Sequence, residues 1–88
     1  MISISQYNLD KIEDLVENIG YKIRYEKGNF RTGACVLQHT KVIVVNKFST
    51  LEIKINSLIQ LVREFEVRRE DLDEKQWLFY KLLLKEDK

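Results

Sequence analysis

Two side-chain types that commonly bind metals or act as nucleophiles each occur once in this 88-residue chain. His39 and Cys35 are four residues apart, on facing sides of a predicted hairpin. A closed zinc site needs four ligands, so this pair does not make one. Cys35 could attack a substrate only beside a base that favours its thiolate, and the sequence identifies no such base. We therefore predict a turn residue at His39, a buried and inert strand cysteine at Cys35, and neither a metal nor a cofactor.

Carboxylates could supply acid–base chemistry if two of them converged on one reacting atom. The acidic pairs of this chain, such as Glu13-Asp14 and Glu70-Asp71, are adjacent in sequence. Adjacent side chains on a helix diverge, because neighbours on one face are three or four residues apart. We interpret these acids as solvated surface charge and predict that the protein is not an enzyme.

Basic residues gather in the middle of the chain, although the net charge is only +1. Residues 21–47 carry six Lys or Arg side chains against one acid, whereas residues 8–19 carry one base against four acids. A cationic sheet face with nearby aromatic rings could bind single-stranded nucleic acid. The candidates for such contacts are Lys22, Arg24, Lys27 and Arg31. However, Tyr21 and Tyr25 alternate with these bases and should face the core, so a solvated sheet face that docks against an acidic helix or partner is the favoured interpretation.

The first part of the chain is predicted to form a helix and two strands. Residues 8–19 show apolar side chains at helical spacing, with Asn8 as the expected N-cap and Gly20 just past the end. Residues 21–26 alternate apolar and charged side chains, the pattern of a strand with one buried face. A second strand is expected at residues 31–38.

The third strand, Val42–Val45, is apolar on both faces. In an antiparallel meander it would lie at the edge of the sheet, where a flat hydrophobic strand invites pairing with another chain. A helix over each face would cover it, and so would a two-fold partner that adds its own strand. Val42 and Val44 are the interface candidates in the second arrangement.

Two helices are predicted after the strands, from about Thr50 to Phe65 and from Asp73 to about Lys85. In the last helix Leu78, Phe79, Leu82 and Leu83 are expected to line one side, and Trp77, Tyr80 and Leu84 another. Aromatic residues on a second helix face are typical of interface anchors, which makes this second stripe an interface candidate. The alternative is that two other elements enclose the helix within one chain.

The order of elements over residues 8–65 resembles the N-terminal half of the ImmA/IrrE-type metallopeptidases of the gluzincin class. The likeness rests on Gly33 after a turn, the apolar strand Val42–Val45 that ends in Asn46, and the helix that follows. In that family this helix carries Phe-Thr-Leu-Ala-His-Glu-Leu-Gly-His, which binds zinc through both histidines and uses the glutamate as general base.

Here the motif positions hold other residues. Ile59 and Arg63 stand where the zinc ligands would be, and Gln60 stands in place of the base. Isoleucine cannot coordinate zinc and glutamine cannot accept a proton. The resemblance therefore implies a related fold in a small bacterial protein, without metal-assisted hydrolysis.

We predict a single domain over residues 1–88 of the α+β class: a helix, a three-stranded antiparallel meander and two C-terminal helices packed on the sheet. The lack of a signal peptide, of a long apolar segment and of a second cysteine favours a cytoplasmic protein that neither spans a membrane nor forms an internal disulfide. The predicted function is that of a small interaction domain, a homodimer through the Val42–Val45 edge or the Trp77 helix. Weak nucleic-acid binding and a non-catalytic zincin-like remnant are the alternatives.

Overall fold

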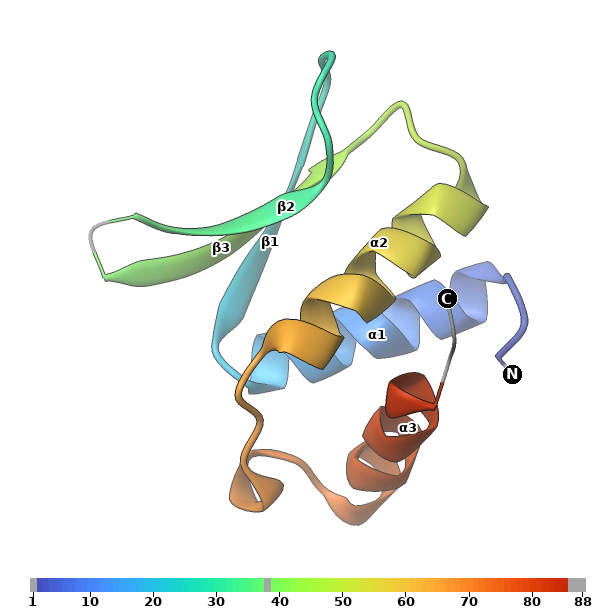
Figure 1. Ribbon diagram of the computed structural model, residues 1–88, viewed down its shortest axis with the longest axis vertical. Coiled ribbons are helices and arrows are strands. Elements are labelled where there is room, and N and C mark those ends of the chain that lie inside the picture. Colours follow the sequence, from blue (N-terminus) through green and yellow to red (C-terminus); the bar gives the residue numbers. More distant parts are fainter. Residues whose placement is uncertain (1, 38, 86–88) are drawn as a thin grey trace.

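The computed structural model describes residues 2–37 and 39–85 and has a mixed sheet with three α-helices (Figure 1). The α+β class is confirmed. The elements, in chain order, are α1 (Gln6–Asn18), β1 (Tyr21–Glu26), β2 (Gly33–Leu37), β3 (Thr40–Asn46), α2 (Leu51–Glu64), a short 3-10 turn η1 (Arg69–Asp71) and α3 (Glu74–Leu84).

The strand order is β1-β3-β2, so the predicted meander is wrong. β1 pairs with β3 in parallel, with Ile23 opposite Ile43, while β2 pairs with the other side of β3 in antiparallel orientation. The most apolar strand therefore lies in the centre, where both of its edges are bonded. A central strand bonded on both edges favours β-branched residues, which agrees with the sequence of β3.

The connection between β1 and β2 explains why the chain does not make a simple hairpin there. Residues 27–32 bend at Gly28 and Asn29 and carry the chain across the end of β3, so that β2 lies on the other side of β3 from β1 (Figure 1). The Asn46 side-chain amide, 8% exposed, donates to the carbonyl oxygens of Gly28 at 3.0 Å and Phe30 at 2.6 Å. Its Oδ1 accepts from the Phe48 N–H at 2.9 Å. A single buried amide thus joins this loop to the end of the central strand.

The two faces of the sheet differ. Ile43 and Val45 point into the core beneath α1 and α2, whereas the alternate residues Val42 and Val44 point to the opposite face. Within residues 2–37 and 39–85 no helix covers that opposite face (Figure 1). Val42 is nevertheless only 5% exposed and Val44 is half-buried. Because β3 is central, the edge position that made Val42 and Val44 candidates for intermolecular strand pairing does not exist.

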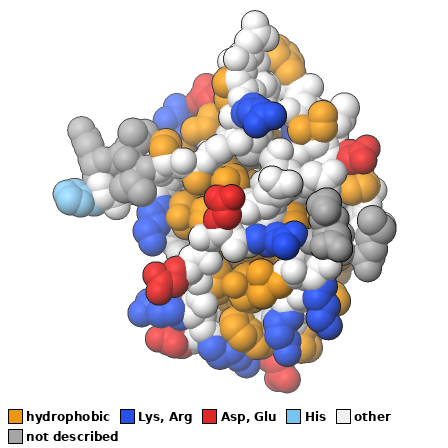
Figure 2. Space-filling view, in the orientation of Figure 1, with side chains coloured by type: hydrophobic (Ala, Val, Ile, Leu, Met, Phe, Trp, Pro, Cys, Tyr) orange, Lys and Arg blue, Asp and Glu red, His pale blue; other side chains and the backbone are white. Residues whose placement is uncertain are grey.

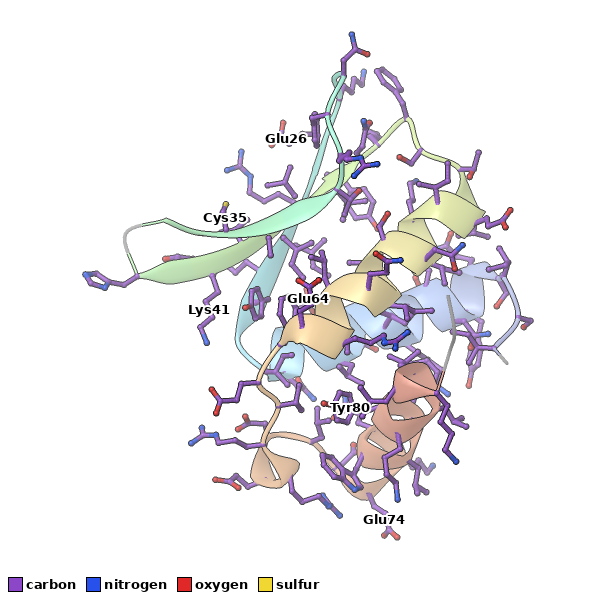
Figure 3. All side chains as sticks on the ribbon, in the orientation of Figure 1. Glu26, Cys35, Lys41, Glu64, Glu74 and Tyr80 are labelled. Carbon is purple, nitrogen blue, oxygen red and sulfur yellow. The ribbon has the colours of Figure 1, made fainter. Side chains whose placement is uncertain are left out.

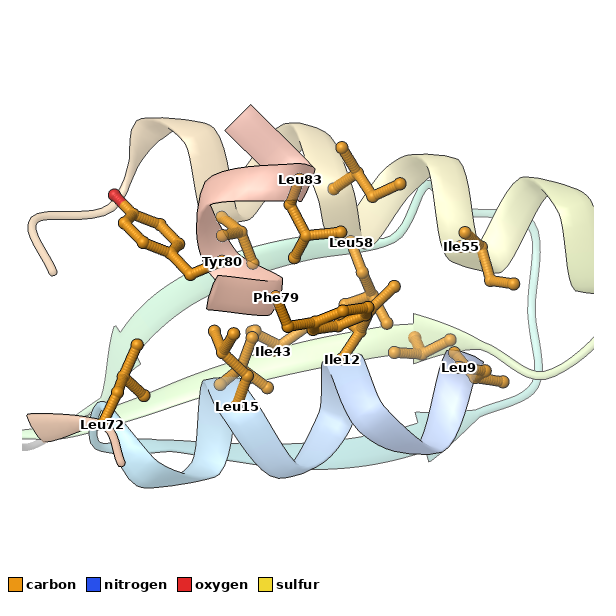
Figure 4. Packing of buried hydrophobic residues seen from close by; sticks show 14 residues of the cluster. Leu9, Ile12, Leu15, Ile43, Ile55, Leu58, Leu72, Phe79, Tyr80 and Leu83 are labelled. Atoms are coloured by element: carbon orange, nitrogen blue, oxygen red, sulfur yellow. The ribbon is translucent and has the colours of Figure 1, made fainter. Parts of the chain in front are cut away.

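The core forms where α1 and α2 pack against the sheet and α3 closes the end of the helical layer (Figure 4). Its largest fully buried side chains include Ile12 and Leu15 of α1, Ile55 and Leu58 of α2, and Leu83 of α3. The prediction placed both C-terminal helices on the sheet. Only α2 lies against it, while α3 packs on the helices and away from the strands (Figure 1).

Helix starts follow local capping chemistry. α1 begins earlier than predicted because Ser5, not Asn8, is the N-cap, its Oγ accepting from the Asn8 N–H at 3.1 Å. The spacing of Ser49 and Glu52 predicts a capping box with Ser49 as the cap of α2, but Thr50 is the N-cap, its Oγ1 accepting from the Ile53 N–H at 3.2 Å, and α2 begins at Leu51. α3 has the predicted capping box, in which Asp73 accepts from the Gln76 N–H at 2.7 Å and Gln76 accepts from the Asp73 N–H at 3.3 Å.

Candidate interaction surface

The outer side of α3 carries large apolar side chains in contact with solvent. Leu78 is 52% exposed, Leu82 50% and Leu84 40%. Leu78 and Leu82 are four residues apart and therefore lie one above the other on the same helix face. They were expected among the core-facing residues, and that prediction is wrong. The helix is apolar almost all round, so its sequence spacing does not reveal which side faces the core.

The residues predicted as the interface stripe lie elsewhere. Tyr80 is 9% exposed and belongs to the core, and Trp77 is half-buried against it. Their ring centroids are 5.4 Å apart, and the Arg69 guanidinium carbon lies 5.3 Å from the Trp77 ring centroid. Figure 3 shows Tyr80 between α3 and the rest of the helical layer. Of the three residues predicted as an interface stripe, only Leu84 is exposed. Trp77 and Tyr80 pack against other parts of the same chain, as the alternative interpretation of this stripe expected.

α1 lies beside α3. The Lys11 Nζ lies 4.2 Å from the Phe79 ring centroid and 5.4 Å from that of Tyr7, whose side chain is 70% exposed. At the other end of α1, the Asn18 side-chain amide donates to Gln76 Oε1 at 2.8 Å. These contacts place the middle of α3 beside the first half of α1, and the start of α3 beside its end.

The exposed charges of the two helices differ mainly in sign. The exposed acids of α1 are Asp10, Asp14 and Glu17, and the exposed bases of α3 and its C-cap are Lys75, Lys81 and Lys85. Glu74 is the one exposed acid on α3 itself. Figure 2 shows apolar side chains gathered over the part of the molecule where α3 lies, with side chains of both charges around them. We call Tyr7, Lys11, Leu78 and Leu82 the α1–α3 surface.

A groove lies between α2 and the segment that enters β2. This groove encloses about 360 Å³ and is lined mainly by polar side chains: Arg31, Thr32, Ile53, Asn56, Ser57, Gln60, Leu61 and Glu64. Glu64 projects from the end of α2 toward the sheet (Figure 3). On α2, Asn56, Gln60 and Glu64 follow one another at four-residue spacing and share this face.

One of the three residues at the motif positions of the metallopeptidase family lines this groove. Ile59 is 5% exposed and part of the core, Gln60 lines the groove and Arg63 is exposed. The three therefore do not converge on one point. Within the part of the chain that the structure describes, no three His, Cys, Asp or Glu side chains are grouped as metal ligands.

Cys35 is exposed on β2, so the prediction of a buried cysteine is wrong (Figure 3). β2 is an edge strand, and its register with β3 places Cys35 opposite Val42, on the face that no described helix covers. His39 lies in the turn between β2 and β3 with φ 72°, and the prediction of a turn residue there is confirmed.

The candidate nucleic-acid residues do not form one track. Lys22 and Arg24 alternate onto the open sheet face, and the Arg24 guanidinium is paired with Glu26 at 2.7 Å. Lys27 follows β1 and Arg31 lines the groove.

The tyrosines point to the helical side, as predicted. Tyr21 stacks on Phe65 with ring centroids 4.2 Å apart, and the Tyr25 hydroxyl donates to the Glu13 carboxylate. The aromatic rings that could stack on bases are therefore on the opposite face from Lys22 and Arg24.

The Tyr25–Glu13 pair has perturbed ionisation. Partial burial raises the pKa of the Glu13 carboxyl, against the lowering effect of the hydrogen bond from Tyr25, and the neighbouring acids of α1 add to the rise. Burial and the hydrogen bond to Glu13 raise the pKa of Tyr25 above its ordinary value of 10.0. The Lys54 Nζ lies 5.4 Å from the Tyr25 ring centroid. This cluster joins α1, β1 and α2 and is part of the framework of the fold.

Neither the family models, the curated proteins nor the solved structures compared with this chain give a match. Among the described residues, no helix has both the length and the apolar character needed to cross a membrane. The α1–α3 surface and the groove are therefore the two candidate functional sites.

Proposed function

We propose that this chain is a small, non-enzymatic protein-interaction domain that self-associates through the α1–α3 surface. The observation that supports this proposal is the pair of half-exposed leucines, Leu78 and Leu82, aligned on the outside of α3. Apolar contact of this kind stabilises association in proportion to the area removed from water.

The free energy gained by burying these leucines limits the affinity of the proposed dimer. Burying the exposed half of one leucine contributes roughly 1 kcal/mol, so the four leucines of two copies contribute about 4 kcal/mol. The loss of translational and rotational freedom on association costs roughly 4–15 kcal/mol. The leucines alone do not outweigh this cost, and Tyr7 together with polar contacts has to supply the remainder. We therefore expect a weak dimer that forms only at high protein concentration.

Sedimentation velocity over a concentration series tests the proposal. The wild-type chain should shift from monomer toward dimer, and Leu78→Gln/Leu82→Gln should remain monomeric. Glutamine is a good helix former, so the change removes apolar area without weakening the helix. Ile53→Gln is the matched control, because Ile53 is also a helical residue, 52% exposed, but lies on α2 beside the groove. A wild-type chain that stays monomeric at all concentrations would refute the proposal, as would unchanged association of the leucine variant.

A further inference from the structure

We propose that the outer edge of β2, together with the groove beside α2, binds an extended peptide as an added antiparallel strand. The ligand is a peptide segment with a basic residue toward its N-terminal end and an acidic residue toward its C-terminal end. The residues that line this site are not those of the α1–α3 surface, so the inference goes beyond the proposed self-association and does not depend on it.

The two outer strands of the sheet differ in how their outer edges are protected. β1 carries charged residues at every second position, and the Tyr25 hydroxyl ties it to α1 by donating to Glu13. β2 has the sequence Gly-Ala-Cys-Val-Leu, and no strand in the described part of the chain pairs with its outer edge. Charged residues, proline and covering elements keep edge strands from pairing with other chains. The sequence of β2 contains neither charge nor proline, so its backbone can accept one more strand.

α2 runs beside β2 in the same direction. Thr32, next to the start of β2, accepts from the Asn46 N–H at 3.1 Å at the end of β3, from which the chain passes into α2. Phe65 follows the other end of α2 and stacks on Tyr21, which lies opposite Lys41, close to the end of β2. The groove beside α2 therefore follows the direction of β2 (Figure 1).

The two ends of the groove carry opposite charges. Arg31 lies where β2 begins and Glu64 where α2 ends, and both side chains line the groove and are exposed. Within residues 2–37 and 39–85 neither of them makes an ion pair. An antiparallel strand beside β2 runs from the Glu64 end to the Arg31 end, so its basic and acidic residues meet opposite charges. A parallel strand meets them in the reverse order, and parallel pairing is slightly less stable.

The spacing of side chains on α2 matches that of a strand. Two rows at four-residue intervals line the groove: Ile53, Ser57 and Leu61, and beside them Asn56, Gln60 and Glu64. Four residues of helix advance about 6 Å, and two residues of strand, which return a side chain to the same face, advance roughly 6.8 Å. Three successive helix-facing side chains of a peptide therefore each meet one member of both rows. β2 itself has five residues, enough to pair with a peptide of that length.

A second copy of this chain is the other source of an added strand. Two β2 strands could pair across a two-fold axis. However, β2 is uncharged and offers nothing to Arg31 or Glu64 at the ends of the groove. A separate peptide with a charge at each end fits both, so the observations favour the peptide.

Fluorescence polarisation with labelled pentapeptides tests the inference. The probe is Lys-Val-Thr-Val-Glu, with an uncharged dye on its N-terminus and an amidated C-terminus, and the comparison peptide is Glu-Val-Thr-Val-Lys. The wild-type chain should bind the probe about threefold more tightly or better, because two attractive contacts replace two repulsive ones. Arg31→Glu/Glu64→Lys should reverse this preference. The matched control, Glu17→Lys/Lys22→Glu, also conserves the net charge but lies outside the groove, and it should keep the wild-type preference.

Backbone methylation separates strand pairing from attraction between charges. Alternate residues of a strand bond to its neighbour, so only one of two modified probes should be affected. One probe is N-methylated on both valines and the other on the threonine. One of them should bind as the unmodified probe does, and the other about tenfold more weakly or worse.

Backbone amide shifts in an isotope-labelled chain locate the bound probe. The signals of Ala34 and Cys35 on β2 should move, and those of Lys22 and Arg24 on β1 should not. Circular dichroism establishes that the charge-exchanged chain is folded, and Arg31→Gln/Glu64→Gln, which should lose the preference, serves if it is not.

Three results would overturn the inference: no binding of the probe at millimolar protein, equal binding of the two charge orders, or equal binding of the two methylated probes. A fourth would assign the edge to a second copy of the chain. That result is a concentration-dependent shift of Ala34 and Cys35 without peptide, in the Leu78→Gln/Leu82→Gln variant that lacks the proposed α1–α3 contact.

Discussion

The side-chain amide of Asn46 donates a 2.6 Å hydrogen bond to the carbonyl oxygen of Phe30, across sixteen residues of sequence. The same amide also bonds Gly28, and its oxygen accepts from the Phe48 backbone. Loop, central strand and the turn into α2 therefore meet at one buried side chain. This arrangement lets β1 and β3 run in parallel although β2 lies between them in sequence.

Asn46→Ala should lower the free energy of unfolding by about 2–3 kcal/mol, because three hydrogen bonds each contribute roughly 0.5–1.5 kcal/mol. Urea unfolding followed by circular dichroism measures the difference. Asn29→Ala, an exposed residue in the loop that Asn46 holds, is the control and should change stability by less than about 0.5 kcal/mol. Equal stability of the Asn46 variant and the wild type would show that the loop does not depend on this amide.

Tyr25→Phe should change how stability depends on alkaline pH. The pKa of Tyr25 is raised in the folded chain above its ordinary value of 10.0. The folded state thus holds the phenolic proton more tightly than the unfolded state does. The stability associated with this group is fully present below pH 10 and is lost as the pH rises from there toward the folded pKa.

Thermal unfolding of the wild type and the Tyr25→Phe variant above pH 10 measures this effect. The wild type should lose stability more steeply, since lysine titration is common to both chains and cancels in the comparison. The absorbance of phenolate near 295 nm gives a second reading, in which Tyr25 should ionise at higher pH in the folded chain than in the unfolded chain. Parallel stability curves would contradict the perturbed ionisation of Tyr25.

The parts of this fold that could be predicted are those fixed by neighbours in sequence. The capping box of Asp73 and Gln76 starts α3 as expected, and the alternation in Tyr21–Glu26 gives β1 its one buried face. Apolar spacing also identifies the buried side of α1, because acids occupy its other positions. In each case the deciding interactions are within a few residues of each other.

The parts that could not be predicted depend on contacts between distant segments. The pairing of β1 with β3 joins strands separated by the whole of β2, and nothing in either strand specifies parallel over antiparallel pairing. The exposure of Cys35 follows from that strand order. The orientation of α3 has another cause: with apolar residues on nearly every side, only its packing on α1 and α2 decides that Phe79 and Leu83 are buried while Leu78 and Leu82 are not.

The orientation of α3 can be measured by comparing Trp77→Ala with Leu78→Ala. Trp77 packs on the core and on Tyr80, so its loss should cost roughly 2 kcal/mol, less than the ~3–5 kcal/mol typical of a fully buried aromatic residue. Leu78 is half exposed, and its replacement should cost about 1 kcal/mol or less, since only the buried half of the side chain is lost from the interior. Trp77 is the only tryptophan, so unfolding has to be followed by circular dichroism and not by fluorescence. The opposite ranking would mean that α3 is rotated about its axis.

The faces of α2 can be tested by introducing histidine pairs. Asn56 and Gln60 both line the groove and are one helical turn apart, with Glu64 a further turn along. Asn56→His/Gln60→His should bind Zn²⁺ and raise the unfolding midpoint as zinc is added, because two histidines at this spacing share a metal ion and only the folded helix aligns them. Ile59→His/Arg63→His has the same spacing, but Ile59 is in the core, so this variant should be destabilised and should gain nothing from zinc. If zinc stabilised the second variant instead, the face of α2 that contains Ile59 would have to point into the groove.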